Sequence, residues 1–187
     1  LAGGQVSSLR AEQAITVTVA VFPVVDLPAV TGSSTVDEGQ SGNFGANIII
    51  SENDKADGSE AITQIVLGNI PAAAAVAFTE IGGATVLQST AAGITTFTIA
   101  GGSEDDIRAT LATVSLTPPL HSDVDINVSV VITKVDGTIG EPEGQVTDTL
   151  AVTHTIAVAA VADGPTLSGS ASGNEDQPIA LPITASL

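Results

Sequence analysis

The feature that most constrains this chain is an internal repeat between its two ends. Residues 14–50 align without gaps on residues 151–187, at a constant offset of 137 positions. The alignment keeps Asp-x-Pro, Gly-Ser and Glu-x-Gln in one register, and 12 of its 37 positions are identical: Ala14/Ala151, Thr16/Thr153, Thr18/Thr155, Ala20/Ala157, Val21/Val158, Val24/Val161, Asp26/Asp163, Pro28/Pro165, Gly32/Gly169, Ser33/Ser170, Glu38/Glu175 and Gln40/Gln177. The chain is therefore expected to hold domains of one kind joined in series.

The repeat predicts three parts. Residues 1–25 are expected to carry the last strand of a preceding repeat, residues 26–162 one complete repeat, and residues 163–187 the first strands of the following repeat. The junctions are Asp26-Leu27-Pro28 and Asp163-Gly164-Pro165. Proline stiffens such a junction and favours an extended residue before it.

Period-two alternation of apolar and polar residues predicts β-strands along the repeat. It is clearest at 15–21, 125–132 and 146–161, and weaker strands are expected at 30–36, 43–50, 61–67, 75–80, 84–89, 93–100 and 112–117. The apolar side chains are almost all Ala, Val, Ile and Leu, with no Cys, Met, Trp or Tyr. Short strands separated by glycine-containing turns indicate an all-β sandwich.

One helical turn is expected at 103–111. Ser103 can cap its first turn, Asp106 stands three residues later as in a capping box, and Ile107 and Leu111 share one face. Carboxylates at 104–106 would face the positive end of the helix dipole, which is the favoured role for them over a metal site.

The charge of the chain excludes two classes of partner. It carries 21 acidic and 4 basic residues, a net charge of −17, so it cannot offer the basic surface that nucleic acids require. The same sign argues against binding to an anionic membrane, and no apolar run is long enough for membrane insertion. The hydrophobic content of 43% argues against disorder.

Several motifs resemble the cadherin-like or Ig-like repeats of giant bacterial RTX adhesins. They are the Asp-x-Pro junction, the turn Glu175-Asp176-Gln177, the run Asp57-Gly58-Ser59-Glu60, and the segment from Leu111 to Pro119. The resemblance spans nearly the whole chain. It departs from the family where Asp37-Glu38-Gly39 stands in place of Asn174-Glu175-Asp176, and the glycine-rich nonapeptide of RTX proteins is absent from this sequence. It implies an Ig-like or cadherin-like β-sandwich that extends an adhesin from the cell surface.

Calcium is the metal that this composition favours. Oxygen ligands are abundant, whereas two isolated His and no Cys cannot build a zinc site. Strands that run away from and back to the first junction would bring Asp54, Asp57 and Glu60 beside Asp26, and would place Glu38 near Asp163. The resemblance implies Ca²⁺ at such junctions. The alternative is a solvated acidic loop that only keeps the surface soluble.

Catalysis finds little support in the sequence. His154 lies within an alternating strand, which favours a sheet position over a general base, and His121 follows two prolines in a loop. No Gly-x-Ser-x-Gly elbow or phosphate-binding loop is present in the sequence. Four Phe are the only aromatic residues besides the two His, too few for the aromatic platforms that carbohydrate sites usually use.

The expected function is therefore that of a structural extender in a large, secreted, calcium-dependent bacterial surface adhesin, not an enzyme. Its partners would be neighbouring repeats of the same chain. Alternatives are a glycan- or protein-binding module of the adhesin and an ancillary domain of a secreted hydrolase. The sequence shows no signal peptide, so it reads as an internal fragment, whose open strand edges could also form a strand-swapped or edge-paired homodimer.

Overall fold

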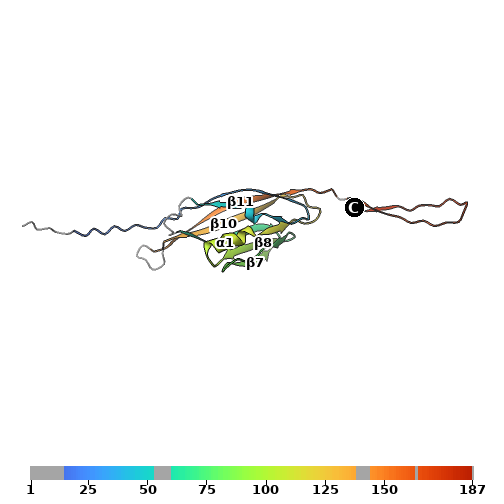
Figure 1. The fold of residues 1–187 in the computed structure, drawn as a ribbon. Coiled ribbons are helices and arrows are strands. Elements are labelled where there is room, and N and C mark those ends of the chain that lie inside the picture. Colours follow the sequence, from blue (N-terminus) through green and yellow to red (C-terminus); the bar gives the residue numbers. More distant parts are fainter. Residues whose placement is uncertain (1–14, 53–59, 138–143, 163, 187) are drawn as a thin grey trace, which may run out of the picture.

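The computed structural model describes residues 15–52, 60–137, 144–162 and 164–186. The chain folds into an all-β sandwich with one short α-helix, as the sequence predicted (Figure 1). Six strands form the main sheet in the spatial order β2-β11-β10-β5-β8-β7. Their bounds are β2 Ser34–Asp37, β5 Ala61–Pro71, β7 Thr85–Ala91, β8 Ile94–Ala100, β10 Ile126–Asp136 and β11 Val146–Ala159. Neighbours run antiparallel except β2, which pairs in parallel with β11.

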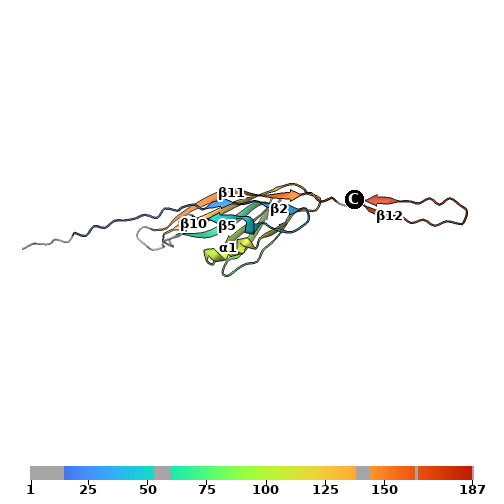
Figure 2. The same cartoon turned by 45° about the horizontal axis from the view of Figure 1, so that its top comes forward.

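A second layer covers one face of this sheet (Figure 2). It contains a three-stranded sheet in the order β3-β9-β6, together with the helix and a 3₁₀ turn. The bounds are β3 Gly42–Asn43, η1 Gly45–Asn47, β6 Ala75–Ala77, α1 Glu104–Ala112 and β9 Ser115–Thr117.

Alternate aliphatic side chains fill the space between the layers. Along β10, Ile126, Val128, Val130 and Ile132 are all buried while the residues between them are not. The second layer places Phe44, Ile107, Leu111, Val114 and Leu116 in the same core. Burying a side chain of this kind contributes about 1.5–3 kcal/mol, so this contiguous core is the main source of stability.

The helix follows the sequence prediction closely. Ser103 Oγ accepts from the Asp106 N–H at 3.2 Å, and Asp106 Oδ2 accepts from the Ser103 N–H at 3.0 Å, which completes the capping box. The backbone N–H groups of Ser103 and Gly83 lower the pKa of Asp106. Ile107 and Leu111 are buried on one face, as expected.

Several predicted strands have different limits. Residues 15–28 belong to no helix or strand, so the strand expected at 15–21 is wrong for this structure. The segment 30–36 is split at Gly32, where φ is +110°, into β1 Ala29–Thr31 and β2. The segment 43–50 is split by η1, which leaves β4 Ile49–Ser51. The strand expected at 112–117 begins only at Ser115, because α1 continues to Ala112.

The two copies of the repeated segment share a local arrangement. β1 pairs with β4 antiparallel near one end of the sandwich. Beyond the other end, β12 Thr166–Ser168 pairs antiparallel with β13 Thr184–Ser186. β12 lies 137 residues after β1, at the offset of the sequence repeat. Figure 1 shows residues 15–25 leaving one end of the elongated sandwich and residues 164–186 leaving the opposite end.

Candidate functional site

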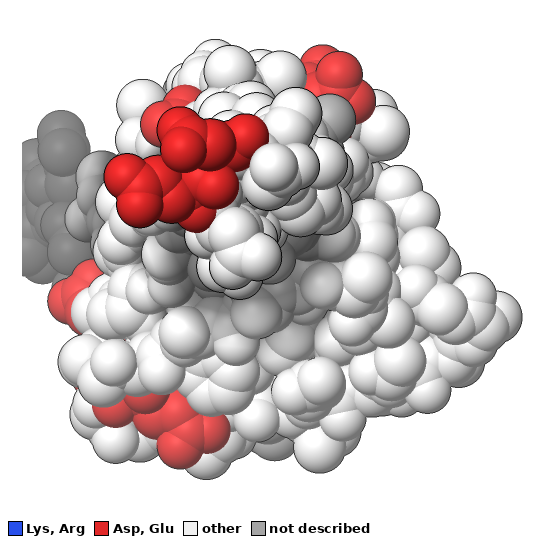
Figure 3. Space-filling view, turned by 90° about the vertical axis from the view of Figure 1, so that its right-hand side faces the viewer, with Lys and Arg blue, Asp and Glu red and all other residues white. Residues whose placement is uncertain are grey.

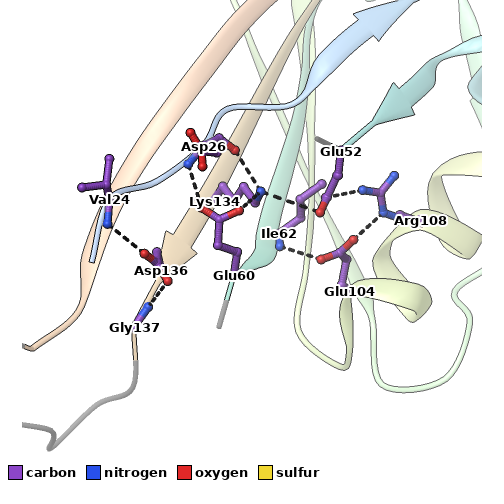
Figure 4. Close-up of polar contacts among 10 residues, drawn as sticks. All are labelled: Val24, Asp26, Glu52, Glu60, Ile62, Glu104, Arg108, Lys134, Asp136 and Gly137. Atoms are coloured by element: carbon purple, nitrogen blue, oxygen red, sulfur yellow. Dashed lines mark hydrogen bonds and ion pairs between the residues drawn. The ribbon is translucent and has the colours of Figure 1, made fainter. Parts of the chain in front are cut away.

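The first junction is held to the end of the sandwich by three side chains (Figure 4). Glu60 Oε1 accepts from the Asp26 N–H at 2.7 Å, and Lys134 Nζ donates to the Asp26 carbonyl at 2.8 Å. Asp136 Oδ2 accepts from the Val24 N–H at 2.8 Å. We name Glu60, Lys134 and Asp136 the linker clamp. All three bind the backbone of the linker, so they fix its path whatever side chains it carries.

Lys134 is the centre of the clamp and is fully buried. Period two along β10 places it on the inward face, where an unpaired ammonium would be very unfavourable. It is paired with the Glu60 carboxylate, and Glu52 Oε2 lies 3.7 Å from its Nζ. Desolvation lowers the pKa of Lys134, but the hydrogen bond that its ammonium donates to Glu60 and the charges of Glu52, Glu60 and Glu104 outweigh it and raise the pKa. Lys134 is therefore a permanent cation inside the junction.

A second cation extends this network toward the helix. Arg108 pairs with Glu52, and its Nε donates to Glu104 Oε1 at 2.7 Å within α1. Arg108 Nη1 also donates to the Ile50 carbonyl at 3.1 Å, and Glu104 Oε2 accepts from the Ile62 N–H at 3.0 Å. The network ties the end of β4, the start of β5, β10 and α1 together at the point where the linker arrives (Figure 4).

One atom of the network is incompletely satisfied. Glu52 Oε2 is buried and has no hydrogen-bond partner, although the Lys134 ammonium lies nearby. A buried charged oxygen in this state costs free energy. Lys134 and Arg108 together therefore compensate the buried carboxylate of Glu52.

The opposite end of the sandwich holds the second junction. Glu38 Oε1 accepts from the Val161 N–H at 3.0 Å, and the Glu38 N–H donates to the Ala159 carbonyl at 3.0 Å. Asp125 Oδ1 accepts from the Val158 N–H at 3.0 Å. The view of this end in Figure 3 shows acidic side chains and, on that face, no lysine or arginine. At this junction the carboxylates of Glu38 and Asp125 each accept from a backbone N–H.

The two junctions use different acceptors for the same linker position. Val24 and Val161 are equivalent in the sequence repeat. The Val24 N–H is bound by Asp136 of the domain that follows it, and the Val161 N–H is bound by Glu38 of the domain that precedes it. A linker between two such domains would bring both kinds of carboxylate to one N–H group.

The predicted calcium ligands are only partly visible. The structure brings Glu60 to Asp26, as the strand path predicted, through the Asp26 backbone N–H. Glu38 reaches the second junction at Val161. Asp54, Asp57 and Asp163 lie outside the described residues. Among the residues that are described, no group of three or more His, Asp or Glu is arranged to hold a metal ion.

Neither Lys134 nor Asp136 was predicted from the sequence to lie at the junction. The signal was present, because 134 and 136 have the same parity as the inward residues 126–132 of the alternating strand. A lysine at an inward position of a strand requires a buried anion. That requirement could have identified the partner of Glu60.

The two histidines fit the structural roles expected for them. His154 is buried, its Nε2 lies 2.9 Å from Ser34 Oγ, and its ring centroid lies 6.1 Å from that of Phe44. Burial lowers the pKa of His154, so the ring is neutral in the core. His121 lies between β9 and β10 with φ of +60°.

Among the described residues, no helix has the length and apolar character needed to cross a membrane. Comparison with known proteins adds no relative: no protein-family model matches the chain, and a search of curated proteins found no significant match.

Proposed function

We propose that residues 26–162 are an extender module in a tandem array, part of a large secreted adhesin at a bacterial surface. The observation that carries this proposal is the linker clamp. Three buried charged groups of the domain hold the backbone of a linker that arrives at one end, while the chain leaves from the opposite end. An arrangement of this kind suits a part that transmits tension along its long axis.

The sequence repeat and the two small sheets support a series of like domains. The segment after the second junction repeats the sequence after the first, and β12 occupies the position of β1 in the repeat. Both segments form a short antiparallel pair. His154 and Ser34, which lie in contact, are both buried in the core.

Calcium enters the proposal at the junctions. In an array, the Glu38 carboxylate of one domain and the Asp136 carboxylate of the next would converge on the same linker N–H, which in the sequence stands two residues before the junction aspartate. Like charges brought this close repel unless a cation lies between them. Ca²⁺ accepts carboxylate oxygens in flexible geometry, so it is the cation we propose for this place.

The test is thermal unfolding of a two-domain protein, residues 26–162 joined to residues 26–187, with millimolar CaCl₂, with MgCl₂ and with chelator. A ligand that binds only the folded state raises the midpoint. We expect calcium to raise the midpoint more than magnesium does, and E38Q to reduce that rise. D148N is a matched control, because Asp148 lies on β11 and its side chain accepts from the Thr149 N–H of the next residue. Equal midpoints in calcium and chelator would remove calcium from the proposal.

A further inference from the structure

Residues 15–21 present an aliphatic face that nothing covers in the described part of the chain. Ile15, Val17, Val19 and Val21 are each exposed by 76% or more. The intervening residues are Thr, Thr and Ala, so the segment has the period of a strand but no β-partner in this structure. A face of four aliphatic side chains in water is expected to have a partner.

The counterpart of this segment in the repeat is part of β11. At the offset of 137, the exposed residues correspond to the inward-facing row of β11: Val152, His154, Ile156 and Val158. The last three are buried in the core. The residues between them, Thr153, Thr155 and Ala157, are identical to Thr16, Thr18 and Ala20. Both faces of the segment therefore match a strand whose environment is known.

The slot that β11 fills has specific requirements. β11 lies inside the main sheet, with β10 antiparallel on one side and β2 parallel on the other. Ile156 stands in register with Ile126 and Ser34, where Val19 would fit with one methylene fewer. Thr155 Oγ1 donates to Asn127 Oδ1 at 2.8 Å, and Thr18 carries the same hydroxyl.

One position differs in chemistry. Val17 corresponds to His154, which has a polar contact of 2.9 Å with Ser34 Oγ. A valine at this interior position makes no such contact. A domain that accepts Val17 in its sheet therefore needs no hydrogen-bonding partner at the position of Ser34. Every other inward position exchanges one aliphatic side chain for another.

We infer that residues 14–22 are the β11 strand of a second domain with this same fold, inserted between the β2 and β10 of that domain. The inference rests on the proposed tandem array and names its interface: the partner is a domain whose main sheet is completed by this segment. The linker at 22–28 would then run without interruption from the sheet of one domain to the clamp of the next. Tension would then pass from β11 of the first domain through the linker to Lys134 on β10 of the next domain.

The experiment uses a hybrid protein in which residues 26–150 are fused to residue 14 of the full chain. The added domain lacks its own residues 151–162 and can complete its sheet only with 14–22. We expect amide hydrogen exchange at 16–21 to be strongly slowed in the hybrid and fast in the chain alone. V19D should abolish the slowing, whereas T16D should keep it, because position 16 corresponds to the exposed Thr153.

A second hybrid separates this inference from the array itself. It joins residues 26–162 to residues 26–187, so both domains keep their native β11. If this hybrid folds as two domains while amides 16–21 remain unprotected in the first hybrid, the inference is overturned and the array survives. If neither hybrid contains two folded domains, both the inference and the array are overturned. Protection that V19D leaves unchanged would also overturn the inference.

Discussion

Lys134 is one of only four basic residues in the chain, and the first junction depends on it. Its ammonium pairs with the Glu60 carboxylate and donates to the Asp26 carbonyl, while Glu60 accepts from the Asp26 N–H. The proximity of Asp26 and Glu60 could be predicted from the path of the strands. The lysine between them was not predicted, because an excess of acidic residues does not show which of them face a buried cation, although the inward parity of position 134 on β10 indicated a buried charge.

Substitution of Lys134 tests this role. We expect K134M to lose about 3–5 kcal/mol of unfolding free energy, because the Glu60 and Glu52 charges stay buried without the ammonium. R108M should lose less, since the Arg108 side chain is 25% exposed and water can take its place. The double variant E60Q/K134M should recover part of the loss. Urea unfolding measures all three, and a K134M loss no larger than that of R108M would contradict the role.

His154 gives the fold a dependence on pH. Burial lowers the pKa of His154 below its ordinary value, so the unfolded chain takes up the proton at a higher pH than the folded protein does. Stability contributed in this way is present above about pH 6.5 and is lost as the pH falls. We expect the free energy of unfolding to fall from about pH 7 to about pH 5.5 by more in the wild type than in H154V. Parallel pH profiles for the two proteins would contradict this account.

At the scale of elements, long alternating strands could be predicted and short ones could not. The strands β8, β10 and β11 were predicted to within a few residues, because β8 and β10 alternate along their whole length and β11 alternates along its second half. The segment 15–21 has an equally clear pattern but forms no strand here. Alternation shows which face of a segment is apolar, but it does not show whether the strands that would pair with the segment belong to the same domain. The breaks within 30–36 and 43–50 depend on tertiary contacts that alternation does not record.

Gly32 makes one of these breaks. Its φ is +110°, and a Cβ there would lie 1.9 Å from the Asn47 carbonyl oxygen, so β1 must leave the line of β2 at this glycine. Gly93 also has positive φ, at +78°, but a Cβ there would meet no atom within 4 Å. We expect G93A to cost about 1 kcal/mol from backbone strain alone, and G32A to cost clearly more. Similar losses for the two variants in urea unfolding would show that the contact with Asn47 does not constrain the strand break.

At the scale of the whole molecule, the two junctions are built differently. The first contains its own cations, Lys134 and Arg108, whereas the second ends in Glu38 and Asp125, each bound to a backbone N–H. Joined in series, an end with built-in cations would meet an end that has carboxylates. The linker clamp and Glu38 would then set the path of the linker. A bound cation would remove the repulsion that remains between the carboxylates. The array would be continuous without calcium and stiff with it.

Small-angle X-ray scattering of the two-domain hybrid of residues 26–162 and 26–187, in calcium and in chelator, tests this claim most directly. We expect a longer maximum dimension and a narrower distribution of interdomain distances in calcium, while each domain stays folded in both buffers. Identical scattering in the two buffers, at calcium concentrations that saturate any site, would contradict it.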